Sequence, residues 1–154
     1  MRLIKLAVIS FIILFTIITL FSLLIPSRVR ISRAINIASD QNKLLTLLKN
    51  KEQWAQWHPI FMNDSTSQMV QTRFLSVNDT LIVTEWQQGS KQRITNGWHL
   101  HILPNADSLT MQWYMDFKLQ WYPWKKFESL FFDKVYGGMM QEGLQNVKEK
   151  AEGK

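Results

Sequence analysis

The hydrophobic pattern divides the chain into parts with different periods. From Leu6 to Ile25, twenty consecutive residues carry no charge, and the most polar among them are serine and threonine. Between residues 29 and 119, apolar and polar residues alternate in short runs, which is typical of strands with one buried face. From residue 124 to 150, apolar residues recur at steps of three and four, which predicts a long amphipathic helix.

The first apolar run has the length of a membrane-spanning helix. Twenty helical residues cover about 30 Å, the thickness of the hydrocarbon core of a bilayer. A buried core helix of this kind needs a larger surrounding domain. A cleaved signal peptide has a shorter apolar segment and a small-x-small cleavage site, whereas Pro26, Ser27 and Arg28 follow here. We therefore expect residues 1–26 to be a transmembrane anchor and residues 27–154 to form one domain.

Basic residues flank this run on both sides. Arg2 and Lys5 precede it, and residues 26–51 hold six basic side chains against one acidic side chain. Because basic flanks tend to stay in the cytoplasm, the heavier cluster favours a cytoplasmic domain, although Arg2 and Lys5 oppose that orientation. Contact with anionic membrane lipids and ordinary topogenic charge explain the cluster equally well.

Five segments alternate between apolar and polar residues as half-buried strands do. They are 29–37, 68–76, 79–87, 91–103 and 108–119. Turn-forming residues separate the last four, so we expect neighbouring antiparallel strands. After the first strand, Ser39 and Asp40 are placed to cap a short helix. A second helical turn holds Trp54 and Trp57 and ends before Pro59, and we expect His58 in this turn to form a local hydrogen bond rather than act as a base.

Arg33 is the most informative polar residue of the first strand, because it interrupts a row of isoleucines. A guanidinium stays charged, so it needs a carboxylate, backbone carbonyls or an anionic ligand. Glu85 is the candidate partner, provided that it lies on the inner row of its strand, for which Ile82 and Trp86 compete. A structural ion pair and contact with a ligand both remain open.

Composition and motifs exclude several functions. The absence of cysteine excludes disulfides, thiolate metal sites and a cysteine nucleophile. The net charge is +6, but the excess is concentrated beside the apolar run and is not spread as in a nucleic-acid-binding domain. His99 and His101 share a strand face without the acidic neighbours that would complete a metal site. The chain has no glycine-rich phosphate loop and no nucleophile elbow, so we expect no catalytic residues, metal or cofactor.

The order of elements and several short motifs resemble one family. The motifs are Pro26-Ser-Arg-Val29 leading into Arg33-Ala-Ile-Asn-Ile37, Trp54-x-x-Trp57-x-Pro59, Pro123-Trp-Lys-Lys-Phe127, Phe132-Asp-Lys134 with Gly137, and Gly143-Leu-Gln-Asn-Val-Lys148. In this combination, nearly everything after residue 25 resembles the START-like helix-grip superfamily, in particular its bacterial polyketide cyclase/dehydrase (SRPBCC) branch.

The resemblance implies an α+β fold in which a curved antiparallel sheet wraps around the long C-terminal helix. It also implies a hydrophobic-ligand cavity between sheet and helix, and a single-pass protein of a bacterial inner membrane. The family usually has six strands where this chain has four, so the cavity would be smaller or open on one side. The name cyclase does not carry an activity to this chain, because the acids and histidines show no catalytic pairing.

Candidate ligand contacts are the inner rows of the strands and the apolar faces of the helical segments. They are Arg33, Trp54, Trp57, Glu85, Asn96, Trp98, Met111, Trp113, Met115, Phe117, Phe127 and Phe131. Ordinary core packing competes as the explanation for the apolar members. We expect a membrane-tethered module that binds a lipid or another hydrophobic small molecule. The alternative is a non-enzymatic interaction or scaffold domain with a fully packed core and an unknown protein partner, and an enzyme is the third possibility.

Overall fold

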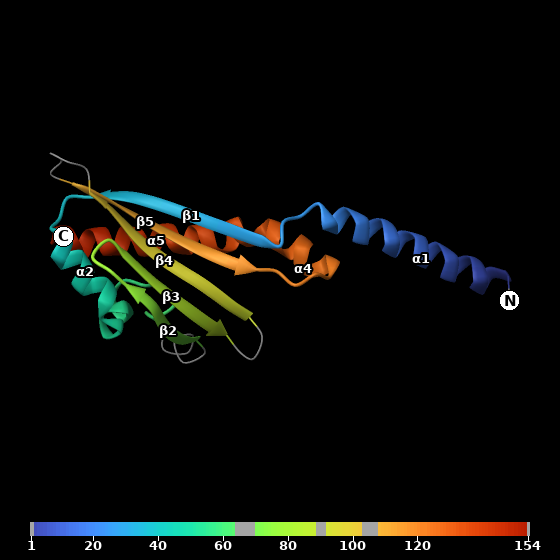
Figure 1. The fold of residues 1–154 in the computed structure, drawn as a ribbon, viewed down its shortest axis with the longest axis horizontal. Coiled ribbons are helices and arrows are strands. Elements are labelled where there is room, and N and C mark those ends of the chain that lie inside the picture. Colours follow the sequence, from blue (N-terminus) through green and yellow to red (C-terminus); the bar gives the residue numbers. More distant parts are fainter. Residues whose placement is uncertain (1, 64–69, 89–91, 103–107, 154) are drawn as a thin grey trace.

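The computed structural model describes residues 2–63, 70–88, 92–102 and 108–153. Its elements in chain order (Figure 1) are α1 (Arg2–Leu23), β1 (Arg28–Ile37), α2 (Gln41–Lys49), the 3₁₀ helix η1 (Lys51–Gln56), β2 (Val70–Val77), β3 (Leu81–Gln88), β4 (Gln92–Ile102), β5 (Leu109–Lys118), α4 (Pro123–Glu128), the 3₁₀ turn η2 (Ser129–Phe131) and α5 (Phe132–Glu152). The five expected strands and the two short helices are confirmed. Positions 68, 69, 91 and 103 of the expected strands lie outside the described residues.

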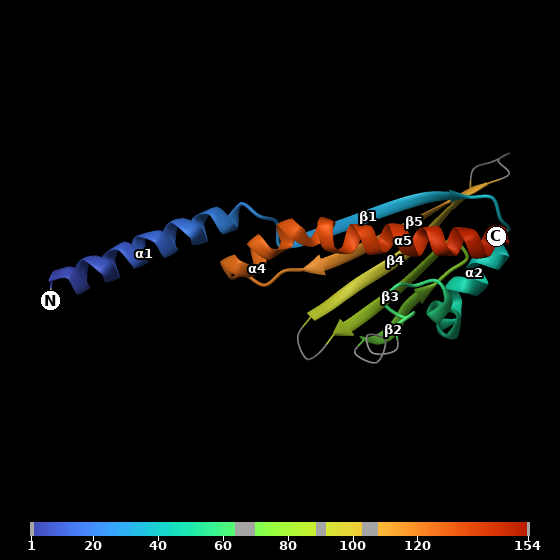
Figure 2. The same cartoon turned by 180° about the vertical axis from the view of Figure 1, so that it is seen from behind.

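The strands form one antiparallel sheet in the order β1-β5-β4-β3-β2. The sheet places the N-terminal strand beside the last strand, so β1 forms one edge and β2 the other. α5 packs on one face of the sheet, mainly along β1 (Figure 2). The chain therefore has the α+β architecture that the sequence predicted, with a long C-terminal helix against a sheet.

The predicted alternation in β1, β4 and β5 is confirmed by the strand register. Arg33 is opposite Trp113, which is opposite Trp98 on its other side. In the same way, Met115 lies between Ile31 and Asn96. These residues share the inner face, which α5, α2 and η1 cover.

Local hydrogen bonds place η1 against that face. The Asp40 side chain accepts a hydrogen bond from Asn42 N at 3.2 Å, so of the two predicted capping candidates, Ser39 and Asp40, the second caps α2. The indole of Trp54 donates to Leu48 O at 2.9 Å, and the indole of Trp57 donates to Leu47 O at 3.3 Å. The end of α2 therefore orients both tryptophan rings toward the sheet.

The expected single helix over residues 124–150 is interrupted. A 3₁₀ turn, Ser129–Phe131, separates α4 from α5. Phe127 and Phe131 are 36% and 64% exposed, and they lie on the surface instead of beside the sheet. Phe132, next to Phe131 in the sequence, is buried in their place. The prediction that Phe127 and Phe131 face a cavity is wrong, because Phe131 and Phe132 are adjacent apolar residues and the row that is buried contains Phe132.

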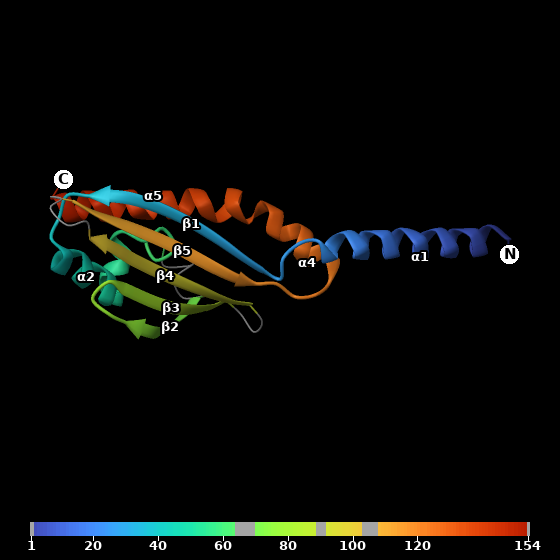
Figure 3. The ribbon, with the colours of Figure 1, turned by 45° about the horizontal axis from the view of Figure 1, so that its top comes forward.

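α1 is the one described helix that is long and apolar enough to span a membrane. It projects beyond the end of the sheet at which β1 begins (Figure 3), and nearly all of its side chains are exposed. A signal sequence near an N-terminus passes the same test of length and composition. At its C-terminal end Ser22 is buried, and Lys126 Nζ in α4 donates to Ile25 O at 2.6 Å and to Ser27 Oγ at 3.0 Å.

Candidate functional site

An aromatic cluster occupies the inner face of the sheet under η1. Its central members are Trp54, Trp57, Trp98 and Trp113. The ring centroids of Trp54 and Trp98 are 5.2 Å apart, and those of Trp98 and Trp113 are 5.8 Å apart. These separations are typical of packed aromatic pairs. The structure thus brings together the candidates that the sequence predicted in η1, β4 and β5.

The candidates on this face are tightly packed. Those with no exposed area are Trp54, Trp57, Asn96, Trp98, Met111, Trp113 and Met115, and Phe117 is 1% exposed. Because these residues have no area open to water, side chains fill the space around the four tryptophans.

Several buried polar atoms on this face have no hydrogen-bond partner among the described residues. They are Thr72 Oγ1, Thr84 Oγ1, Trp86 Nε1, Asn96 Nδ2, Trp98 Nε1 and His58 Nε2. Thr84 lies opposite Asn96 in the register, and Thr72 lies opposite Trp86, so the atoms follow one band across β2, β3 and β4. Unpaired buried polar groups are rare in native proteins, and each costs about 1–3 kcal/mol. Their concentration in one band is the most unusual feature of the core.

His58 packs against the band from the segment after η1. Its ring is fully buried, with centroids 4.9 Å from Trp86 and 4.8 Å from Trp113. Burial lowers the pKa of His58 to about 3, so the ring is neutral near pH 7. Because Nδ1 accepts a hydrogen bond from Ile60 N at 3.2 Å, the proton resides on Nε2, the nitrogen without a partner. The sequence predicted only the local hydrogen bond, although the four-residue step from Trp54 to His58 indicates a shared side of the turn.

Arg33 and Glu85 lie on opposite faces of the sheet. Arg33 Nη2 donates to Asp133 Oδ1 at 2.8 Å, whereas Glu85 Oε1 is 3.6 Å from Arg93 Nη1 on the outer face. The proposed pairing of Arg33 with Glu85 is therefore wrong. Ile82 and Trp86 occupy the inner row of β3 because the hydrophobic core accommodates them at lower cost than a carboxylate.

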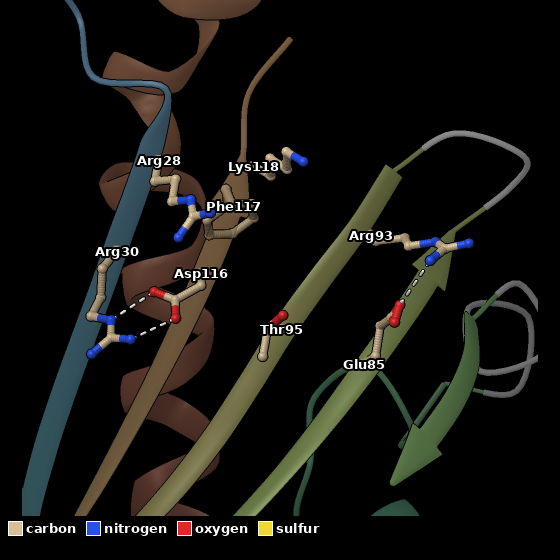
Figure 4. A pocket seen from close by; sticks show the side chains of 8 residues that line it. All are labelled: Arg28, Arg30, Glu85, Arg93, Thr95, Asp116, Phe117 and Lys118. Carbon is tan, nitrogen blue, oxygen red and sulfur yellow. Dashed lines mark hydrogen bonds and ion pairs between the residues drawn. The ribbon is translucent and has the colours of Figure 1, made fainter. Parts of the chain in front are cut away.

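A second candidate site is an open pocket of about 530 Å³ on the outer face of the sheet. Figure 4 shows its lining residues: Arg28, Arg30, Glu85, Arg93, Thr95, Asp116, Phe117 and Lys118. Arg30 donates two parallel hydrogen bonds of 2.6 Å to Asp116, and its guanidinium stacks on Tyr114 at 4.4 Å from the ring centroid. This arrangement fixes Arg30 and raises its pKa, chiefly through the hydrogen bonds to Asp116.

The positive charge of this pocket is concentrated near the end of α1. Arg28 and Lys118 lie opposite each other in the register, at the start of β1 and the end of β5. Neither side chain has an ion-pair partner in the described part of the chain, whereas Arg30 and Arg93 do. The pocket can attract anions without offering a catalytic pair.

His99 and His101 lie on the outer face, with ring centroids 3.9 Å apart. His101 Nε2 is 3.1 Å from Gln112 Oε1. Partial burial and the neighbouring His101 lower the pKa of His99. Within the described ranges, no third histidine, cysteine or carboxylate joins them to hold a metal ion.

Comparison with known proteins places the fold. No family model and no curated protein matches the sequence. Among solved structures, the di-domain ARO/CYC StfQ from the steffimycin biosynthetic pathway has a TM-score of 0.61 at 11% identity over 81% of this chain. XoxI from Bacillus cereus has a TM-score of 0.57 at 10% identity over 79% of this chain and 94% of its own length. A START superfamily protein from Mycobacterium smegmatis has a TM-score of 0.53 at 15% identity over 80% of this chain and 97% of its own.

These similarities define the class of fold. The chain has the START-like fold that polyketide aromatase/cyclase proteins share, as its motifs predicted. The match spans 51% of the StfQ chain, which contains two domains. At 15% identity or less, the similarity establishes the fold and leaves ligand and activity to be argued from the site.

Proposed function

We propose that this protein is a membrane-tethered module that binds a lipid or another hydrophobic small molecule at the inner face of its sheet. The observation that carries the proposal is the band of unpaired polar atoms among the buried tryptophans. A core selected only for packing would place apolar side chains at these positions, because each unpaired group destabilises the fold. The START-like fold supports a site on this face of the sheet, the face that also carries the C-terminal helix.

The band also specifies the chemistry of the ligand. Asn96 Nδ2, Trp86 Nε1, Trp98 Nε1 and the protonated His58 Nε2 are hydrogen-bond donors. A matching ligand is therefore largely apolar and carries acceptor oxygens, such as carbonyl, hydroxyl or carboxylate groups. Binding would pair the donors while the tryptophan rings surround the apolar part.

Entry of a ligand requires side chains to move, because the face is packed in this structure. Met111 and Met115 are suited to this movement, since methionine is unbranched and repacks at low cost. Tethering by α1 would keep such a module at the bilayer, where molecules of this chemistry are dissolved. The contact of Lys126 with the end of α1 would hold the domain close to the membrane surface.

Native mass spectrometry of the full-length protein, released from lipid nanodiscs, tests the proposal. We expect a co-purifying apolar molecule of defined mass, which delipidation removes and an acceptor-bearing lipid restores. Protein that stays free of ligand after incubation with fatty acids, sterols and phospholipids would contradict the proposal.

A scaffold or interaction domain is the second candidate. The observation in its favour is that Trp98, Trp113 and Met115 have no exposed area at all. A core of this kind needs no ligand, and the domain would then act through its surface. Ligand-free protein that binds one partner protein with defined stoichiometry would support this alternative.

A further inference from the structure

A row of exposed apolar side chains follows the segment from the end of β5 to the start of α5. We define this aromatic ridge as Trp121, Trp124, Phe127, Leu130, Phe131 and Val135, which are 77%, 60%, 36%, 64%, 64% and 63% exposed. Contiguous exposed apolar surface on a soluble domain marks an interaction site.

The ridge is the apolar face of an amphipathic segment turned away from its own domain. Trp124, Phe127, Phe131 and Val135 follow one another at steps of three and four, which places them on one side of the helical segment. The opposite side, with Lys126 and Ser129, is buried against the domain. In an ordinary surface helix the polar side faces the solvent, so this orientation requires an apolar environment outside the domain.

The position of the ridge indicates which environment that is. α4 lies beside the C-terminal end of α1 in both Figures 1 and 3. Lys126 Nζ donates to Ile25 O at 2.6 Å, directly after α1. If α1 crosses a bilayer, the ridge lies at the level where the hydrocarbon core meets the headgroups.

The charges around the ridge match the same environment. Lys125 and Lys134 alternate with the ridge residues along the segment. A hollow lined by Arg93, Lys118 and Trp121, among others, connects the ridge with the basic pocket of the outer face. The carboxylates nearby are Glu128, which pairs with Lys125 at 2.6 Å, and Asp133, which pairs with Arg33 at 2.8 Å. The basic side chains near the ridge that are outside these two pairs complement anionic headgroups. Tryptophan beside basic residues is typical of the membrane interface.

We infer that the aromatic ridge inserts into the interfacial layer of an anionic bilayer, and that Arg28 and Lys118 bind lipid phosphates on the headgroup side of the ridge. This inference rests on the tether of the proposed function and adds a second membrane contact to it. α1 attaches the domain to the bilayer at one place, the end of the helix that Lys126 contacts. The ridge fixes one orientation, with the outer-face pocket at the headgroups.

The distribution of tryptophan makes the inference measurable. Trp121 and Trp124 are exposed, whereas the other five of the seven tryptophans are at most 2% exposed. Fluorescence quenching by phospholipids brominated on their acyl chains therefore reports on the ridge. The full-length protein is reconstituted into brominated phosphatidylcholine vesicles with and without phosphatidylglycerol, and carbonate extraction of the same vesicles measures the tether independently.

We expect quenching of the exposed tryptophans that is stronger in the anionic vesicles. W121F/W124F should abolish it while the protein stays in the carbonate pellet, and F127S/F131S should reduce it severalfold. The matched control is L75S/I102S, which replaces two residues of similar exposure (51% and 53%) outside the ridge and should leave quenching unchanged.

The outcomes separate the ridge from the tether. Protein that resists carbonate without quenching of Trp121 and Trp124 overturns the inference and leaves the tether intact. If carbonate releases the protein, α1 does not anchor it in the bilayer. Quenching on anionic vesicles then tests by itself whether the ridge inserts. Equal quenching in the F127S/F131S variant and the parent also overturns the inference.

Discussion

Asp133, in the first turn of α5, accepts a hydrogen bond of 2.8 Å from Arg33 in β1, one hundred residues earlier in the chain. One turn later, Gly137 provides the space for the guanidinium, because a Cβ at that position would collide with Arg33 Nη2. The ion pair and the close approach of Arg33 to Gly137 mark the place where β1 and α5 meet.

Replacement of Arg33 by methionine should reduce the free energy of unfolding by at most about 1 kcal/mol. The side chains of Arg33 and Asp133 are 33% and 68% exposed, and partly solvated ion pairs contribute little. A fully buried partner would instead make the loss about 3–5 kcal/mol. Urea denaturation measures the difference. E85L provides the control, because Glu85 lies on the other face of the sheet and its effect should add to that of R33M.

Two glycines of α5 should respond differently to alanine. A Cβ at Gly143 would lie 2.7 Å from Trp113 Cζ3 and 3.0 Å from Pro59 Cδ, whereas nothing lies within 4 Å of a Cβ at Gly138. G138A should stabilise the protein by about 1 kcal/mol through helix propensity. G143A gains the same propensity but must displace a rigid buried ring, so it should be less stable than G138A by about 1–3 kcal/mol. Equal melting temperatures of the two variants would show that the Trp113 ring shifts without a loss of stability.

The sequence predicted those elements in which one row of residues is clearly more apolar than the other. In β5 the row containing Trp113 and Met115 alternates with polar residues, so the inner face could be assigned without a structure. In β3 the consecutive residues Leu81, Ile82 and Val83 are all apolar, and the wrong row placed Glu85 inside. Which row of β3 faces inward depends on its contacts with β4, and the alternation of residues within β3 carries no information about those contacts.

The candidate site was predicted in part for the same reason. Trp54 and Trp57 were assigned to the inner face, and the structure places them against Trp98. His58 was assigned only a local role, because its burial depends on Trp86 and Trp113, which are distant in the sequence. The partner of Arg33 was missed because nothing local indicates a pair of residues separated by one hundred positions.

Acid should destabilise the protein through His58. Its pKa is about 3 in the folded state and near 6.5 in the unfolded chain, so the unfolded state binds the proton more tightly. The contribution of the neutral His58 to the stability of the fold is therefore complete above pH 6.5, and it is lost progressively as the pH falls toward 3. Between about pH 7 and 5, protonation of His58 in the unfolded chain should lower the free energy of unfolding by about 2 kcal/mol.

Urea denaturation at a series of pH values measures this loss. H58L should flatten the profile over that range, even if the variant is less stable at every pH. L100A is the control, since it truncates a buried side chain without a titratable group and should lower stability without changing the slope. The same slope in H58L and the parent would show that His58 is not the titrating group.

The hydroxyl of Thr84 should oppose stability and favour ligand binding. Thr84 Oγ1 is buried without a partner among the described residues, and Thr84 lies opposite Asn96, whose amide nitrogen also lacks one. T84V keeps the shape of the side chain and removes the unpaired group, so it should raise the free energy of unfolding of the ligand-free protein by about 1 kcal/mol.

The same substitution should weaken ligand binding, because it deletes one hydrogen-bonding group from the band. A fluorescent fatty-acid probe should bind T84V about 3- to 10-fold more weakly than the parent, which corresponds to one neutral hydrogen bond. T110V is the matched control, since the Thr110 hydroxyl donates to Asn36 Oδ1 at 2.8 Å on the outer face. It should leave probe affinity unchanged. A loss of stability in T84V together with unchanged probe affinity would show that the hydroxyl stabilises the fold. The unpaired polar atoms would then no longer support ligand binding.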